Sequence, residues 1–268
     1  MLSIIISSYQ PHYYTALEQN IAATCGVEYE LIKIDNPGVM GLCEAYNKGA
    51  EKATYENLLF LHEDVKFHSQ NWGLRVLEGL QIPDAGLIGI AGSKRKFNLP
   101  YGFYNAMPGE NFAFLHHSGE AHLEIKDDAI PVPVRVIDGV FIAMTKKVWS
   151  EFSFAKDLSG YHFYDLNISL RVSEQFQNYL IPNIGIEHFS KGNFGDHWIR
   201  ACLNFFKTGN YRYDSVLPKE KRDLRIFWYQ RLFTEKISFG NRLQYVLNMG
   251  TNKDTLKAAV EFLIHKKF

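Results

Sequence analysis

The segment LLFLHEDVKF, Leu58–Phe67, decides how the rest of the chain is interpreted. It opens on an unbroken apolar run, as in a strand that is buried on both faces of a parallel sheet. His62, Glu63 and Asp64 follow at once, and the ligands of open α/β sheets bind outside the carboxyl ends of the strands. A carboxylate at that edge can bind a divalent cation, and the cation can bind a diphosphate. The plainer alternative is a strand that simply ends in a polar turn.

The segments before this strand predict a β-α-β-α-β order. Leu2–Ile6 and Glu30–Ile34 are short apolar runs rich in isoleucine, which is typical of strands. Tyr14–Ala23 and Gly41–Ala53 carry apolar residues at helical spacing, so each presents one apolar stripe. Parallel strands need right-handed crossovers, which place the connecting helices on the faces of the sheet. The order therefore predicts an α/β fold with a mixed, mainly parallel sheet and helices on both faces.

Strands and helices continue to alternate after the decisive segment. Two prolines in Ile130–Val136 restrict that strand to a sheet edge or a bulge. Residues 94–128 are irregular and rich in Tyr, Phe and His, as in functional or mobile segments, and residues 187–192 are expected to form a loop. The remaining predictions are helices at Trp72–Leu80, Val148–Phe152 and Asp165–Phe176, and strands at Gly86–Gly92, Val140–Met144 and Tyr179–Ile186.

The composition excludes some functions. The 268 residues allow one large or two modest domains. Lys plus Arg and Asp plus Glu both number 29, which argues against a nucleic-acid partner. Cys25, Cys43 and Cys202 form no CxxC pair and fit a reducing compartment. Because no stretch resembles a signal peptide or a membrane-spanning helix, we expect a cytoplasmic protein for which contact with the inner face of the membrane stays open.

The character of the chain changes at Asp196. Residues 1–195 hold the alternating strands and helices, whereas residues 196–268 hold amphipathic segments such as Asp223–Phe233 and Lys253–Phe268. We therefore predict an α/β domain over residues 1–195 and a helical C-terminal extension over residues 196–268. Such helices can pack on the first domain, form a homodimer or lie on a membrane surface, and the sequence leaves these alternatives open.

Five local matches within residues 1–195 together resemble the GT-A glycosyltransferases, in particular the family-two-like bacterial sugar transferases. In chain order they are SIIISSYQ, IDNPG, GLCEAYNKGAEKATYENLLFLHEDV, DGVFIAMTKKVW and FYDLNISLR. The third resembles the segment that leads into the DxD strand of the family, and the fifth resembles the motif with the catalytic acidic residue. The resemblance implies a GT-A catalytic domain over residues 1–195 and a hexosyltransferase-like enzyme of polysaccharide biosynthesis.

The resemblance also implies a metal site and a catalytic base. Asp64, at the last position of the DxD motif, and the late His188 are expected to bind Mn²⁺ or Mg²⁺, which would bridge the diphosphate of the donor. Asp165 is expected to take the proton of the acceptor hydroxyl in a reaction that inverts the anomeric carbon. The plainer alternatives are a turn aspartate, a structural histidine and a helix N-cap.

Further contacts follow from the same resemblance. The residues implied in nucleotide binding are Ser8, Tyr9, Asp35, Asn36 and Glu63. The residues implied near the sugar or the acceptor are Asp138, Gly139 and Arg171. An aspartate such as Asp35 can accept the N3 hydrogen of uracil or thymine, and a UDP-sugar is the favoured donor among the nucleotide-diphosphate sugars. The acceptor would be a saccharide or a lipid-linked hydroxyl.

Two positions depart from the pattern of the family. His62 stands at the first acidic position of DxD, and Tyr164 stands at the first position of the acidic pair that ends in Asp165. These departures keep a second hypothesis open, a non-catalytic protein that binds nucleotide sugars or glycans on the same fold. A nucleotidyltransferase would need an early glycine-rich phosphate loop, which the turn SSYQPHYY does not supply.

Overall fold

The computed structural model describes residues 1–117, 129–190 and 192–264. The chain forms two compact units. The first unit combines Met1–Lys94 with Phe112–Lys191, and the second combines Arg95–Asn111 with Gly192–Phe268. The chain therefore leaves the first unit after Lys94 and returns to it at Phe112.

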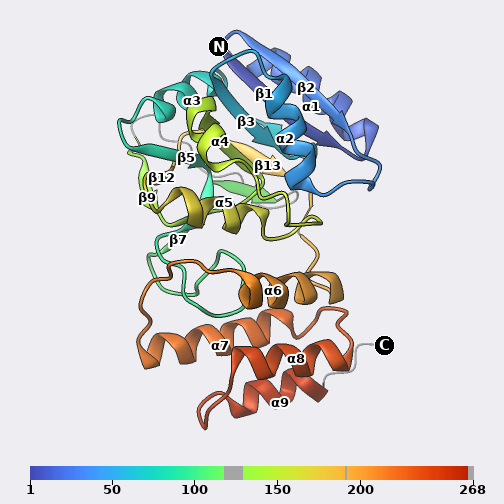
Figure 1. Ribbon diagram of the computed structural model, residues 1–268, viewed down its shortest axis with the longest axis vertical. Helices are drawn as coiled ribbons and strands as arrows, with labels where there is room; N and C mark the ends of the chain where they lie inside the picture. Colours follow the sequence, from blue (N-terminus) through green and yellow to red (C-terminus); the bar gives the residue numbers. More distant parts are fainter. Residues whose placement is uncertain (118–128, 191, 265–268) are drawn as a thin grey trace. The chain divides into compact units, whose positions relative to one another are not determined.

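The first unit is built on a mixed sheet, whose strands are β1 Leu2–Ser8, β2 Tyr29–Asp35, β3 Asn57–Leu61, β5 Ala85–Gly89, β9 Val132–Val134, β11 Phe141–Thr145 and β12 Gln177–Leu180. The strand order is β2-β1-β3-β11-β5-β12-β9, and Figure 1 labels the strands of this sheet except β11. β1 pairs in parallel with β2 and β3, whereas β11 is antiparallel to β3 and β5. The prediction of an α/β fold with a mixed sheet is confirmed.

Helices cover both faces of this sheet, and they are α1 Pro11–Thr24, α2 Leu42–Lys52, α3 Trp72–Leu80, α4 Lys146–Phe152 and α5 Tyr164–Val172. Successive residues of β3 point to opposite faces. Leu58 and Phe60 share a buried cluster with residues of α2, α4 and α5. Leu59 and Leu61 share another with residues of α1 and α3. The unbroken apolar run of β3 is therefore the result of burial on both faces.

Two three-stranded sheets complete the β-structure described here. One has the order β4-β13-β8 and consists of β4 Val65–Phe67, β13 Ile186–His188 and β8 Leu115–His117. The other has the order β10-β6-β7 and consists of β10 Val136–Ile137, β6 Ala91–Ser93 and β7 Asn111–Ala113. The first of these sheets carries His188, and Asp64 immediately precedes its strand β4.

The structure corrects two strand predictions. Tyr179–Ile186, predicted as one strand, forms the end of β12 and the start of β13, because the two halves pair in different sheets. Gly86–Gly92 is divided between β5 and β6 for the same reason. Glu187 and His188, expected in a loop, therefore lie in β13.

The second unit is helical, with α6 Asp196–Thr208, α7 Pro218–Leu232, α8 Phe239–Met249 and α9 Leu256–Ile264. Of these, α8 has no counterpart among the predicted segments. The segment Arg95–Asn111 belongs to the same unit, and the hydroxyl of Tyr245 in α8 donates a hydrogen bond to Pro100 O over 2.8 Å. Within the described residues, every helix is too short or too polar to cross a membrane.

The packing of α2 on β1 generates a stability prediction at Gly49. A Cβ atom added there would lie 2.2 Å from Cγ2 of the fully buried Ile5. Gly49→Ala should therefore lower the free energy of unfolding by about 1–3 kcal/mol through overpacking, measured by chemical denaturation. Gly240→Ala in α8 is the control, since no atom lies within 4 Å of an added Cβ. That substitution should leave stability unchanged or improve it, and equal behaviour of the two variants would contradict the predicted packing.

Candidate metal centre and acidic pair

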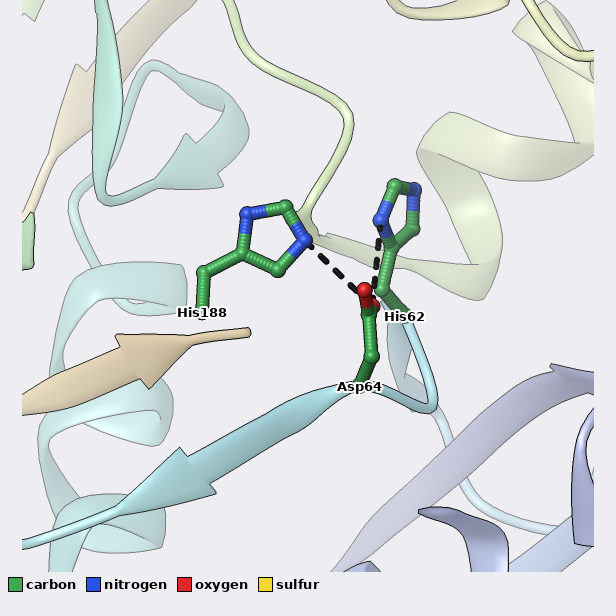
Figure 2. Close-up of side chains that lie close together, drawn as sticks. All are labelled: His62, Asp64 and His188. Atoms are coloured by element: carbon green, nitrogen blue, oxygen red, sulfur yellow. Dashed lines mark ion pairs between the residues drawn. The ribbon is translucent and has the colours of Figure 1, made fainter. Parts of the chain in front are cut away.

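The first candidate site is a cluster of His62, Asp64 and His188 (Figure 2). His188 Nε2 lies 3.3 Å from Asp64 Oδ1, and His62 Nδ1 lies 3.9 Å from the same oxygen. One ligand atom from each residue lies within 4.8 Å of the other two. The side chains converge from two segments that are more than 100 residues apart in the sequence.

Backbone pairing brings these segments together. His62 and Asp64 lie where the chain passes from β3 to β4. His188 in β13 is the antiparallel partner of Val65 in β4, and the amide of Phe189 donates to Asp64 O over 3.0 Å. The ladder therefore places His188 beside Asp64 without relying on the side chains themselves.

The charges of the cluster suit a cation. Burial acts to raise the pKa of Asp64, but the hydrogen bond to His188 and the electrostatic effect of the neighbouring His188 and His62 imidazoles outweigh burial and lower the pKa to about 2. Burial, together with the charge of His188, lowers the pKa of His62. At neutral pH the cluster therefore offers an ionised carboxylate and a neutral imidazole, which are the forms that bind metal ions.

Tyr164 fixes the orientation of His62. Its hydroxyl donates to Gly139 O over 2.9 Å, and the same oxygen lies 2.8 Å from His62 Nε2. Burial raises the pKa of Tyr164 well above its ordinary value, so the hydroxyl keeps its proton. Because that proton goes to Gly139 O, the Tyr164 oxygen accepts the hydrogen of His62 Nε2. Nδ1 of His62, which faces Asp64, then carries a lone pair.

Gly139 is required by this contact. A Cβ atom added there would lie 2.1 Å from the Tyr164 hydroxyl oxygen. Gly139 itself is buried. The structure thus gives Gly139 a packing and hydrogen-bonding function against Tyr164, whereas its contact with a sugar or an acceptor stays a prediction.

Asp165 follows Tyr164 and lies in the first turn of α5. Its helix is capped at Phe163, which has a left-handed φ of 66°, so Asp165 is not the N-cap. Burial, followed by the negative charge of Asp138, raises the pKa of Asp165 to about 7. Asp138 is itself held by the amide of Val140, which donates to its Oδ1 over 3.1 Å. The two carboxylates are thus close enough for one to alter the proton affinity of the other.

Among the predicted nucleotide contacts, Glu63 has the clearest structural function. Its Oε1 accepts hydrogen bonds from the amides of Tyr9 and Gln10 over 2.9 and 2.7 Å, and it thereby fixes the turn between β1 and α1. Oε2 of Glu63 is buried and makes no hydrogen bond within the described part of the chain. The Glu63 carboxylate therefore links the end of β1 to the segment that carries His62 and Asp64.

The other predicted nucleotide contacts lie at the ends of β1 and β2. Ser8 and Asp35 are partners in the parallel register of these strands. The Asp35 side chain is 79% exposed and forms an ion pair with Lys33 over 2.7 Å. Asn36 is buried, and its side chain bonds Ser7 Oγ and the backbone of Met40, so it shapes the turn.

Arg171 lies apart from Asp138 and Asp165. It is at the C-terminal end of α5, and its guanidinium donates to Ser153 O over 2.8 Å and to Asn167 Oδ1 over 3.2 Å. These contacts hold the segment after α4 against α5. The structure therefore brings Asp138, Gly139 and Asp165 together but holds Arg171 at the opposite end of the helix.

Ser190 and His117 lie near the cluster of His62, Asp64 and His188, but they were not predicted as metal ligands or as residues that orient the ligands. Ser190 Oγ lies 3.1 Å from His188 Nε2, and the ring of His117 lies 5.7 Å from that of His188. His117 is the parallel partner of His188 in β8. The only local signal for His117 is the His-His pair itself, whose two side chains point to opposite faces of a strand.

The family model described as "Glycosyltransferase like family" matches residues 3–211 of this sequence. The chain belongs to this glycosyltransferase-like family. A search among curated proteins found no match. The predicted assignment to a glycosyltransferase enzyme is thus confirmed at the level of the family.

Comparison with solved structures identifies the fold of this chain. The crystal structure of GalNAc-T7 with UDP, GalNAc and Mn²⁺ is similar with a TM-score of 0.56 and 11% identity, and the match covers 98% of this chain and 54% of that chain. This chain thus spans about half the length of the GalNAc-T7 chain. A197 from STIV has a TM-score of 0.40 and 11% identity, with 71% and 86% of the two chains covered. At such low identity the first likeness shows the fold, and the GT-A prediction is confirmed.

The contact between His62 and Tyr164 generates a prediction about stability and metal binding. Tyr164→Phe removes the hydroxyl that His62 and Gly139 O share, so it should lower the free energy of unfolding by about 1–2 kcal/mol. It should also weaken Mn²⁺ binding about tenfold or more, because an unsupported imidazole loses its orientation. Calorimetric titration and chemical denaturation measure the two effects.

The control for this prediction is Tyr55→Phe, because the Tyr55 hydroxyl donates to Glu28 Oε1 at an exposed position. It should change neither stability nor Mn²⁺ affinity measurably. Unchanged Mn²⁺ affinity in Tyr164→Phe would contradict the assigned function of Tyr164.

Proposed function

We propose that this glycosyltransferase moves a sugar from a nucleotide-diphosphate donor, with UDP-sugars favoured, to a hydroxyl of a saccharide or lipid-linked acceptor. The observation that carries the proposal is the convergence of His62, Asp64 and His188, with Tyr164 joining this cluster to Asp165 in the first turn of α5. Polysaccharide biosynthesis is the proposed context. The presence of UDP, GalNAc and Mn²⁺ in the structure of GalNAc-T7 supports the choice of donor and metal.

The donor set fits a divalent transition-metal ion. His62, Asp64 and His188 supply two imidazoles and a carboxylate, a set that suits Mn²⁺ better than Mg²⁺, since Mg²⁺ prefers oxygen ligands. The proposed cofactor is therefore Mn²⁺, with Mg²⁺ as the alternative. When bound, such an ion supplies positive charge against the diphosphate of the donor.

The nucleotide is proposed to lie over the ends of β1 and β2. Asp35 is exposed there and can accept the N3 hydrogen of uracil, and the turn with Ser8 and Tyr9 offers hydroxyl and backbone groups. Asn36 and Glu63 are proposed to support this surface, since both hold turns at its edge.

Asp165 is proposed as the general base of an inverting transfer. The acceptor oxygen attacks the anomeric carbon while its proton passes to the Asp165 carboxylate, and the bond from that carbon to the diphosphate oxygen breaks. Burial, followed by the charge of Asp138, raises the pKa of Asp165 to about 7, close to the pH at which a general base is most effective. Asp138, Gly139 and Arg171 are proposed on the acceptor side, with Arg171 acting through the position of α5.

The remaining proposals concern the whole chain. We propose a catalytic domain over residues 1–195 and a helical extension over residues 196–268, with Arg95–Asn111 as a segment of the first that groups with the extension in the second compact unit. We also propose that the protein lies at the cytoplasmic side of the membrane. A homodimer or a peripheral membrane contact through the extension stays a proposal, and nucleic acid is not a proposed partner.

The first test is nucleotide release. The protein is incubated with UDP-sugars, GDP-sugars, Mn²⁺ and candidate acceptors, and liberated nucleotide diphosphate is measured. Asp64→Ala should reduce release at least a hundredfold, because the carboxylate nearest both imidazoles is lost. Asp254→Ala, at an exposed position in the second unit, should retain full activity.

The outcome separates the two functions that the sequence allows. Donor-dependent thermal stabilisation without turnover in the unmodified protein would instead support a non-catalytic nucleotide-sugar or glycan-binding protein. The departures at His62 and Tyr164 are the observation that favours this second function. If the protein shows no turnover and is not stabilised by any sugar nucleotide, that result would contradict both proposed functions.

The pKa of Asp165 generates a pH prediction. A base with a pKa of about 7 is protonated and inactive at lower pH, so kcat/KM should fall about tenfold per pH unit below that value and level off above it. Asp165→Asn should lose turnover while keeping donor binding in a thermal-shift assay. A flat profile between pH 5 and about 8, with chemistry limiting the rate, would contradict the assignment of Asp165 as base.

A further inference from the structure

A second cluster of metal-binding side chains lies on the β4-β13-β8 sheet. It consists of His68, His116 and Glu187, and one ligand atom from each lies within 4.8 Å of the other two. His68 Nε2 lies 3.1 Å from Glu187 Oε2, and the rings of His68 and His116 are 5.5 Å apart. None of these residues belongs to the cluster of His62, Asp64 and His188.

Strand pairing explains why these three side chains meet. Glu187 in β13 is the register partner of His116 in β8. The amide of His68, one residue beyond β4, donates to Gly185 O over 2.8 Å and so continues the ladder between β4 and β13. His68, His116 and Glu187 therefore come from three adjacent strands and point to the same face of the sheet.

The same alternation separates the two clusters. Glu187 and His188 are consecutive residues of β13, so their side chains point to opposite faces. His116 and His117 are consecutive residues of β8, and their partners in register are Glu187 and His188 respectively. One face of this small sheet thus carries His188 and His117, and the other carries the second cluster.

The donor set of the second cluster is that of a zinc site. Two imidazoles and one carboxylate are a common set of three protein ligands for Zn²⁺, which takes a water or another ligand at its fourth position. Zn²⁺ binds these ligands at about 2.0–2.2 Å, so its ligand atoms are about 3.3–3.6 Å apart, and 3.1 Å between His68 and Glu187 is already close to that spacing.

Access to the second cluster is also suitable. The side chains of His68 and Glu187 are 31% and 15% exposed, whereas His116 is buried. An ion can therefore enter from solvent, and a water molecule can occupy its fourth coordination position. Lys66 is the partner of Glu187 in β4, but its side chain is exposed and can extend into water.

We infer that His68, His116 and Glu187 bind a Zn²⁺ ion that ties β4, β8 and β13 together on the face opposite His188. The ion holds in register the strands whose ends carry Asp64 and His188.

The test counts zinc in a protein whose first cluster has been removed. His62→Ala combined with Asp64→Ala gives the background, and the chelator-treated protein is dialysed against Zn²⁺ and assayed for bound metal. This background should bind one Zn²⁺ per chain, and Zn²⁺ should raise its melting temperature. Adding His68→Ala or Glu187→Gln should abolish the stoichiometric binding and the rise in melting temperature. Both positions are partly exposed, so the fold should survive, as circular dichroism can verify.

His197→Ala in the same background is the matched control, because His197 is an exposed histidine of α6 in the second unit. It should leave one Zn²⁺ per chain. The inference is overturned if the background protein binds no Zn²⁺, or if folded variants lacking His68 or Glu187 still bind one ion with unchanged affinity.

Discussion

The pairing of β13 with β4 is the constraint on which the candidate site depends. It places the His188 imidazole 3.3 Å from the Asp64 carboxylate, although the two residues are far apart in the sequence. Backbone hydrogen bonds, including the one from Phe189 N to Asp64 O, fix this geometry before any ion is bound. A site that is organised by the backbone loses little conformational entropy when its ligand arrives, which is how preorganised sites gain affinity.

The two residues that depart from the pattern of the family, His62 and Tyr164, are in direct contact. His62 replaces an acidic residue of the DxD motif, and Tyr164 replaces an acidic residue beside the proposed base. The structure joins the two by a hydrogen bond of 2.8 Å between Nε2 of His62 and the hydroxyl of Tyr164. Two carboxylates at these positions would repel one another in a buried setting, whereas a neutral imidazole can donate a hydrogen bond to a phenol oxygen without a net charge on either group. The exchange keeps a side chain at position 62 that can bind a metal ion, and it leaves Asp165 as the acidic residue of the second motif.

The sequence predicted the elements whose pattern is local. The continuous apolar run of β3, the helical stripes of α1, α2 and α3 and the edge position of β9 follow from spacing and proline chemistry. The division of Tyr179–Ile186 into two strands could not be predicted in this way, because an apolar run does not show that the chain changes sheets. The sequence also gave no sign that Arg95–Asn111 joins the helical unit, since that depends on contacts with distant residues.

The candidate site was predictable only in part. Asp64 and Asp165 are recognisable as acidic residues at element ends, and His188 follows from the family resemblance. The bond of Tyr164 to His62 and the approach of His117 to His188 are long-range contacts, which no local periodicity encodes. The most direct measurement is crystallography with Mn²⁺ and UDP at the manganese absorption edge. We expect an anomalous peak within bonding distance of Asp64 and His188, with the diphosphate on its open side. A peak held by other residues, with Asp64 and His188 turned apart, would contradict the proposed metal centre.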